Sequence, residues 1–221
     1  ILNKYTDYKT KIIYFPSWSE EVNLNKKQLI NINIPDDYLK IVFTGNLGDA
    51  QNLEEVIEVA NKLKNLKIKW IIVGDGKKYN WLKSQIENYN LRDKFLLFGS
   101  QPKSSMPKFF NLADVFLVSL KQGKAFSKTI PAKIQSYLYV GKPILGHVSG
   151  ESKEILINSK ASLVSNPSDL INFEKNILRI YNADKSLINQ MSSNAKKYYE
   201  KNFNQKKLFK SFTNLINTLD L

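Results

Sequence analysis

Lys40-Ile-Val-Phe-Thr-Gly-Asn-Leu-Gly48 is a short apolar segment that runs directly into a turn with two glycines. The apolar run predicts a buried strand, and the glycines that follow it mark its end. Residues 52–64 then repeat apolar side chains three and four positions apart, which is the spacing of one face of a helix. A strand, a glycine turn and a helix in this order form the first half of a βαβ unit.

The same order recurs along the rest of the chain. We predict further strands at 68–73, 94–98, 114–119, 143–147 and 161–164, helices at 78–89, 104–112, 131–140 and 151–158, two or three helices within 168–219, and a short strand at 11–15. Strands that alternate with helices indicate a parallel sheet, and strands this apolar are covered on both faces. The predicted fold class is therefore α/β, a Rossmann-like parallel sheet flanked by helices, with a helical C-terminal tail.

The composition supports a folded domain and argues against several kinds of site. The chain has 221 residues, of which 43% are hydrophobic and 12% aromatic, so it can bury a core. It has no cysteine, which excludes disulfides and cysteine-bound metals, and its one histidine, His147, argues against a histidine-based metal site or a serine–histidine triad. We expect no metal and no cofactor. No apolar run approaches the roughly 20 residues needed to cross a bilayer.

The formal charge of +13 favours anionic partners. Such a surface attracts nucleic acid, anionic lipid or phosphorylated ligands, although lysines spread along a chain also serve simply to keep a domain soluble. A noncatalytic basic domain that binds nucleic acid therefore stays open as an alternative. No motif that reads DNA or RNA supports it, and we do not expect nucleic acid as a partner.

Glycine-rich turns follow three of the predicted strands. Ligands of parallel sheets bind beyond the carboxyl ends of the strands, and glycine lets the backbone approach a ligand closely. The candidate substrate-binding residues in these turns are Gly45, Asn46, Gly48, Gln51, Gly74, Gly76, Lys77, Gly99 and Ser100. The turns complete neither a dinucleotide-binding fingerprint nor a Walker A loop, and ordinary tight turns are the alternative interpretation.

The loop 124–130 runs into a helix that is predicted to open with Pro131. Proline in the first turn wastes no hydrogen bond, and the free amides and the positive dipole end would face the loop. Lys128, Thr129 and Lys133 surround that end, together with Lys124. We predict a phosphate or diphosphate site there, because a bound anion would remove the conflict between Lys133 and the helix dipole.

These segments together resemble the C-terminal half of a family 4 glycosyltransferase with the GT-B fold. The resemblance runs from about Ile12 to the end of the chain, and it rests on Phe43-Thr-Gly-Asn-Leu-Gly48, Val73-Gly-Asp-Gly76, Phe98-Gly99 and Gly141-Lys-Pro-Ile-Leu145. It implies a nucleotide-sugar donor, expected to be a UDP-sugar, transfer with retention of configuration, and no obligatory metal. Some UDP-sugar epimerases share this architecture, so an epimerase half-domain stays open as an alternative.

The chain departs from the usual family pattern at four positions. A pair of glutamates in the family corresponds here to Lys128 and Ser136, and an Arg and a Lys of the first loop correspond to Asn46 and Gln51. Residues 129–138 instead resemble a subgroup that includes N-acetylfucosamine transferases of O-antigen and capsule synthesis. The resemblance implies that Ser136 faces the ribose, that Gly99 and Ser100 flank the base, and that the residues around 128–133 hold the diphosphate.

The resemblance also implies a domain order and a setting. Residues 1–24 would connect from an N-terminal domain absent from this chain, 25–203 would bind the donor, and 204–221 would form a helix that packs back toward that domain. The absent domain would bind the acceptor, which we expect to be a lipid-linked saccharide, and would hold the catalytic residue. We expect a cytoplasmic protein with peripheral contact to anionic membrane, and an isolated chain without turnover.

Overall fold

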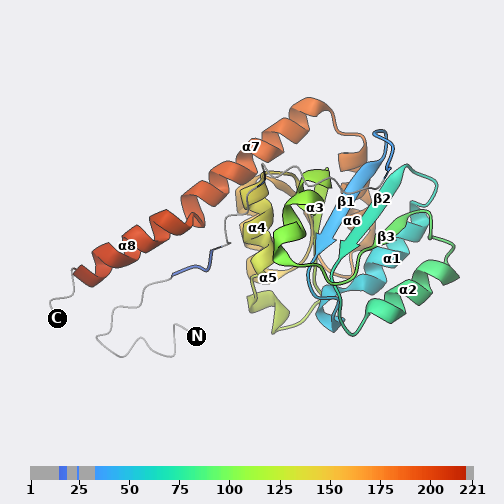
Figure 1. The fold of residues 1–221 in the computed structure, drawn as a ribbon, viewed down its shortest axis with the longest axis horizontal. Helices are drawn as coiled ribbons and strands as arrows, with labels where there is room; N and C mark the ends of the chain where they lie inside the picture. The colour runs from blue at the N-terminus through green and yellow to red at the C-terminus, as the bar shows by residue number, and fades with distance from the viewer. Residues whose placement is uncertain (1–14, 19–23, 25–32, 218–221) are drawn as a thin grey trace.

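The protein is an α/β sandwich built on one parallel sheet (Figure 1). The computed structural model describes residues 15–18, 24 and 33–217. The six strands lie in the order β3-β2-β1-β4-β5-β6, and each neighbouring pair is parallel. Their bounds are β1 Leu39–Thr44, β2 Ile68–Val73, β3 Phe95–Leu97, β4 Val115–Ser119, β5 Ile144–His147 and β6 Ser162–Ser165. The Rossmann-like fold class is confirmed.

The helices cover both faces of the sheet. They are α1 Leu53–Lys62, α2 Tyr79–Asn88, α3 Met106–Leu112, α4 Ala132–Val140, α5 Gly150–Ser159, α6 Leu170–Tyr181, α7 Lys185–Asn202 and α8 Gln205–Asn217, with short 3₁₀ turns η2 Asp49–Gln51, η3 Lys103–Ser105 and η4 Phe126–Lys128. One core packs α1, α2 and α6 against the sheet, and the other packs α3, α4 and α5 against the opposite face. The central strand β1 contributes Ile41 and Phe43 to the first core and Val42 to the second. This two-sided burial explains why the strands read as continuous apolar runs.

The order of the strands places a crevice beside β1. The chain moves outward from β1 through β2 to β3, and then returns to lay β4 on the other side of β1. In open parallel sheets the loops on either side of such a switch part at the carboxyl ends of the strands. The 45–48 turn after β1 and the 120–131 loop after β4 flank this point. Two of the predicted ligand-binding segments, the 45–48 turn and the loop before α4, therefore lie at the topological switch.

Sequence and structure agree closely on the elements. Every strand predicted from residue 40 onward differs from the observed one by no more than one residue at either end. The helix predicted from Pro131 begins at Ala132 instead, because Pro131 has the extended angles φ −62° and ψ 133° of a residue that precedes a helix. Its carbonyl still accepts the first bond, from the Ile134 amide at 2.9 Å. The predicted strand 11–15 falls on residues outside the described part, except for Phe15, which is not in a strand.

The C-terminal tail leaves the body of the domain. Helix α7 packs along α4, and α8 continues from it past the edge of the sandwich (Figure 1). No residue of α8 is buried. Its aromatic side chains meet the segment 15–18, with Trp18 4.9 Å from Phe209 and Phe15 5.3 Å from Phe212 between ring centroids. The two ends of the described chain therefore lie against each other.

Candidate functional site

The three glycine turns form one continuous edge at the carboxyl ends of β1, β2 and β3. The Gly45 amide donates to the Val73 carbonyl at 2.9 Å, and the Gly74 amide donates to the Gly99 carbonyl at 2.8 Å. A Cβ atom on Gly74 would lie only 1.8 Å from the Gly45 carbonyl oxygen, and Gly74 has a φ of +144°. The backbones therefore approach so closely that only glycine fits at this position.

The turns after β1 and β2 also interlock farther out. The Leu47 amide donates to the Asp75 carbonyl at 2.8 Å, and a Cβ atom on Gly76 would lie 2.4 Å from Oδ1 of Asn46. A Cβ atom on Gly48 would lie 2.8 Å from Nδ2 of the same side chain. The Asn46 side chain thus lies between the two turns and is itself exposed.

The third turn offers open surface. Gly99 has a φ of +60°, and no heavy atom lies within 4 Å of the place where its Cβ would stand. Ser100 beside it is exposed, and the Gln101 side chain folds back to donate to the Phe98 carbonyl at 2.9 Å. The turn after β3 therefore leaves room for a planar group next to the turn after β2.

Helix α4 reaches β1 through Lys133 in its first turn. The Lys133 ammonium donates to Oε1 of Gln51 at 3.0 Å and lies 3.7 Å from the centroid of the Phe43 ring. A Cβ atom on Gly45 would lie 3.3 Å from the Lys133 Nζ. The side chain keeps partial exposure, but its amine end is enclosed, and burial lowers the pKa of Lys133 to about 7. The start of α4 therefore faces the glycine turns.

Tyr137, one helical turn beyond Lys133, fixes α4 to the end of β1. Its hydroxyl accepts from the Thr44 amide at 2.9 Å and lies 3.1 Å from the Thr44 hydroxyl. Its ring is buried and stacks on Phe116, with 4.1 Å between centroids. Burial raises the pKa of Tyr137 to about 12. Sequence reasoning missed this residue, although its spacing of four from Lys133 puts both on one helix face.

The loop before α4 is braced by α5 rather than open on all sides. The Thr129 amide donates to the Phe126 carbonyl at 3.1 Å, and its hydroxyl donates to the Ala125 carbonyl at 2.8 Å. The Ser152 hydroxyl of α5 donates to the Thr129 carbonyl at 2.7 Å. Both donors of Thr129 are thus engaged inside the loop, while Lys128 beside it is exposed.

The remaining predicted residues differ in their exposure and in their hydrogen bonds. Ser136 is half-buried, and its hydroxyl donates to the Ala132 carbonyl at 3.4 Å within α4. Lys77 is exposed, whereas its neighbour Lys78 donates to Glu54 at 2.8 Å. Lys121 donates to the same carboxylate at 3.2 Å. Lys78 and Lys121 therefore form ion pairs with Glu54 of α1, whereas Lys77 is exposed to solvent.

His147 belongs to a buried polar network behind the site. Its Nδ1 lies 2.7 Å from the Ser165 hydroxyl, and its Nε2 contacts the Glu55 carboxylate. The Ser168 amide donates to that carboxylate at 2.9 Å, and Phe173 stacks on the imidazole with 4.3 Å between centroids. Burial lowers the pKa of His147 although Glu55 acts against this. The network joins β5, β6 and α1.

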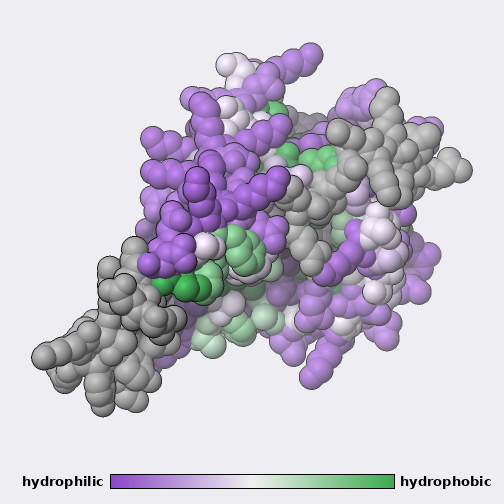
Figure 2. Space-filling model, turned by 60° about the vertical axis from the view of Figure 1, so that its left-hand side comes forward, coloured by the Kyte–Doolittle hydropathy of each residue, from purple (hydrophilic) through white to green (hydrophobic). Residues whose placement is uncertain are grey.

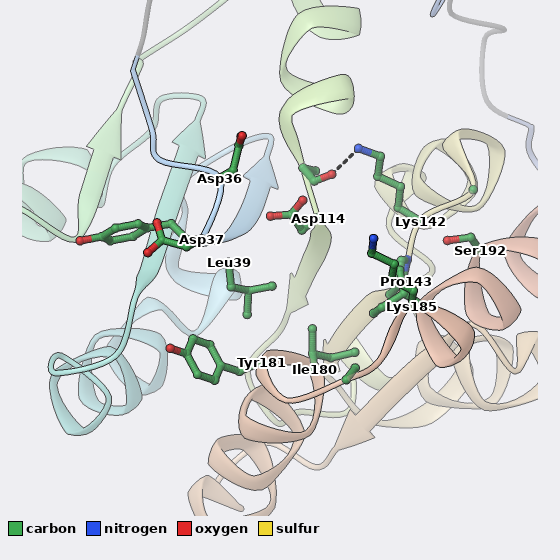
Figure 3. A pocket seen from close by; sticks show the side chains of 15 residues that line it. Asp36, Asp37, Leu39, Asp114, Lys142, Pro143, Ile180, Tyr181, Lys185 and Ser192 are labelled. Atoms are coloured by element: carbon green, nitrogen blue, oxygen red, sulfur yellow. Dashed lines mark hydrogen bonds between the residues drawn. The ribbon is translucent and has the colours of Figure 1, made fainter.

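A separate cavity of about 700 Å³ opens at the opposite edge of the sheet. Figure 3 shows Leu39, Asp114 and Pro143 in its lining, and these residues stand at the amino ends of β1, β4 and β5. Two of its charged groups make contacts between elements of the fold. Asp114 pairs with Lys40 at 3.3 Å, and Lys142 donates to the carbonyls of Asn111 and Ala113 at the end of α3. Since ligands of such sheets bind at the carboxyl ends, this cavity is not the candidate site.

Within residues 15–18, 24 and 33–217, no three His, Cys, Asp or Glu side chains come together as metal ligands would. In the same part of the chain, no helix is both long and apolar enough to cross a membrane.

Comparison with known proteins assigns the family. Residues 25–198 match the model of a family described as glycosyl transferases group 1. The chain belongs to this family. Among curated proteins, it is 31% identical over 140 residues to WcaI of Escherichia coli, which is named as a colanic acid biosynthesis glycosyl transferase. It is 30% identical over 144 residues to the glycosyltransferase WbjE of Pseudomonas aeruginosa. These matches cover 59% and 61% of this chain but about a third of each relative, 33% and 34%.

Solved structures show that the fold is that of GT-B glycosyltransferases. HepE of Anabaena, in complex with UDP-glucose, superposes with a TM-score of 0.69 at 16% identity, covering 82% of this chain and 49% of that one. Sucrose-phosphate synthase of Thermosynechococcus elongatus superposes with a TM-score of 0.68 at 17% identity, covering 84% and 46%. The chain therefore spans about half the length of these two proteins.

Proposed function

We propose that this chain is the donor-binding half of a retaining glycosyltransferase that uses a UDP-sugar in the synthesis of cell-surface polysaccharide. One observation carries the proposal: Lys133 of α4 stands against the Gly45 turn of β1. This contact points the first turn of α4, where the amides of Ala132 and Lys133 have no partner within the helix, at the glycine edge of the sheet. The UDP complexes of the GT-B neighbour HepE and the polysaccharide roles named for the relatives support it.

The chemistry needs a site that stabilises a leaving diphosphate. As the bond from the sugar to the nucleotide breaks, negative charge grows on the diphosphate, and preorganised donors and cations can lower the barrier by several kcal/mol, on the order of 3 for one donor. We assign this role to Lys133 and Lys128 with the backbone around 129–133, in which the amides of Ala132 and Lys133 begin the first turn of α4. The 45–48 turn, with Asn46 and Gln51, would line the other side.

The nucleoside would lie along the rest of the glycine edge. Gly99 and Ser100 leave open surface for a base, and the Gly74–Gly76 turn with Lys77 lies between them and the diphosphate. Ser136 would face the ribose. The hydroxyl of Ser136 can exchange its 3.4 Å bond within the helix for a ribose hydroxyl at little cost, because that internal bond is long.

The acceptor would bind on a second domain. The exposed aromatic side chains of the tail, Phe209 and Phe212, lie beside Phe15 and Trp18 of the segment that precedes the domain. Figure 2 shows apolar residues gathered on this face within a largely hydrophilic surface. We propose that residues 204–221 pack toward an N-terminal domain, which follows the order of the GT-B fold. The acceptor we propose is a lipid-linked saccharide, reached from the cytoplasm by a basic surface in peripheral contact with anionic membrane.

Calorimetric titration of this chain tests the proposal. UDP is expected to bind, GDP and dTDP to bind less tightly, and a short DNA or RNA oligonucleotide not to bind at physiological salt. Lys128→Ala should weaken UDP binding, whereas Lys62→Ala, which removes an exposed lysine on α1, should not. Failure of all three nucleoside diphosphates would overturn the assignment. Salt-sensitive binding of the oligonucleotide alone would favour the nucleic-acid alternative.

A further inference from the structure

In the part of the chain that the structure describes, the Lys133 amine forms no ion pair with a carboxylate. It lies 3.7 Å from the centroid of the Phe43 ring, 3.0 Å from the amide oxygen of Gln51 and beside the backbone of Gly45. An aromatic face and an amide oxygen can orient an ammonium group but do not neutralise it. These neighbours therefore hold the amine without compensating its charge.

Charged groups on the surrounding elements are engaged elsewhere. Asp49 and Glu54, from η2 and α1, contact Lys78 at 3.8 and 2.8 Å, and Glu54 also pairs with Lys121. On α4 itself the Tyr137 hydroxyl is bonded to Thr44. The loop before α4 presents only cations, Lys124 and Lys128.

Burial is the cause that lowers the pKa of Lys133 to about 7. In the free protein near neutral pH, the amine is consequently divided between its charged and neutral forms.

We propose that Lys133 couples donor binding to proton uptake: the diphosphate enters with a proton that converts the enclosed amine to ammonium. This inference rests on the proposed function, since it requires the diphosphate at the start of α4. The proton comes from the buffer, and no other bond changes. An anion beside the amine favours the charged form, just as a carboxylate would. Lys133 is thus the residue that makes the site select for a charged donor, with Gln51 positioning its amine.

Linkage fixes the sign of the pH dependence. Below the pKa of the free protein the amine is already charged, and UDP affinity does not depend on this group. Above it, each UDP must bring a proton, so affinity should fall about tenfold per pH unit until the pKa of the complex is reached. Affinity therefore decreases from pH 7 upward.

Calorimetry at pH 8 in two buffers of different ionisation enthalpy measures the proton directly. UDP is fully ionised there, because a phosphate monoester loses its second proton near pH ~6. With a pKa of about 7 for Lys133, the unchanged chain should take up about 0.9 proton per UDP. Lys62→Met, which removes an exposed lysine, should take up the same amount.

Three variants locate the proton. Lys133→Arg carries a permanent charge and should bind UDP without proton uptake. Gln51→Glu places a carboxylate beside the amine, keeps it charged before UDP arrives, and should also abolish the uptake. Lys133→Met should bind more weakly and take up none. Circular dichroism confirms the fold of each, and the two charged variants remain informative if the methionine variant fails to fold.

The outcomes separate the inference from the function on which it rests. UDP binding without proton uptake in the unchanged chain, or equal uptake in Lys133→Arg, would overturn the inference and leave the proposed function intact. Absence of UDP binding at every pH from 6 to 9 would overturn both.

Discussion

The carbonyl oxygen of Gly45 occupies the space in which a side chain of Gly74 would begin, 1.8 Å from an ideal Cβ. Gly74 also has a φ of +144°, which L side chains rarely adopt. The closeness of these two residues aligns the turns after β1 and β2 into one edge. Any atom added here must push apart the ends of β1 and β2 at the point where we place the donor.

Gly74→Ala should therefore be among the most damaging single-methyl changes in this chain. Backbone strain of this kind costs about 1–3 kcal/mol, and the clash with Gly45 adds to it. Gly99→Ala is the matched control, because its Cβ would meet nothing within 4 Å and only the φ of +60° is unfavourable. The free energy of unfolding measured in urea should be clearly lower for Gly74→Ala than for Gly99→Ala. Equal values would contradict the close approach of Gly45 and Gly74.

Tyr137→Phe should destabilise the domain through one buried amide. Removing the hydroxyl leaves the Thr44 amide without its 2.9 Å partner, and an unsatisfied buried donor costs about 1–3 kcal/mol. Tyr89→Phe, at a side chain with 42% exposure, should change little. Chemical denaturation of the two variants measures the difference, and UDP affinity should also fall in Tyr137→Phe because α4 loses its anchor.

Lys133→Met should raise stability, with a pH dependence of defined sign. The pKa of Lys133 in the folded chain, about 7, lies below the usual 10.5. Below pH 7 the buried amine is therefore charged, which reduces the stability of the folded chain. Between pH 7 and 10.5 the unfolded chain binds the extra proton, and stability of the unchanged chain rises. The melting-temperature gain of the variant should thus be greatest at or below pH 7 and vanish near pH 10.5. A constant gain would show that the amine is not enclosed.

His147 should make the domain sensitive to mild acid. Its pKa is lowered by burial, so the unfolded chain binds a proton that the folded chain refuses. Stability should fall as the pH drops through the unfolded value near 6.5, and level off once the folded histidine is protonated. Between pH 7.5 and 5.5, the melting temperature of His147→Gln should fall less steeply with decreasing pH than that of the unchanged chain, even if the variant is less stable at pH 7.5. Identical slopes would count against this origin.

The sequence predicted those features of the site that depend on backbone geometry. Glycine at 45, 74 and 99 after apolar runs indicated strand ends, and parallel strands bring their carboxyl ends to one edge, so convergence followed from the fold class. The family was recognisable for the same reason, since its motifs are largely these turns and Gly141, which ends α4 with a φ of +76°.

The directions of side chains were not predictable in the same way. From the sequence, a lysine in the first turn of a helix can equally extend into solvent or bind an anion. Only the hydrogen bond from Lys133 to Gln51, which is 82 positions away in the sequence, shows that the side chain points inward. Tyr137 reads as an ordinary core residue until Thr44, 93 positions away, is placed beside it. The internal bonds of Thr129 depend on the conformation of η4 and on α5, which no local pattern encodes.

The edge-to-face contact of Trp18 with Phe209 joins the segment that leads into the domain to the last described helix, α8. In the domain order that we propose, both connections to an N-terminal domain would pass through this contact. Such a domain would then rotate about a single hinge. A rotation that separated Trp18 from Phe209 would change the surroundings of the indole and therefore its fluorescence.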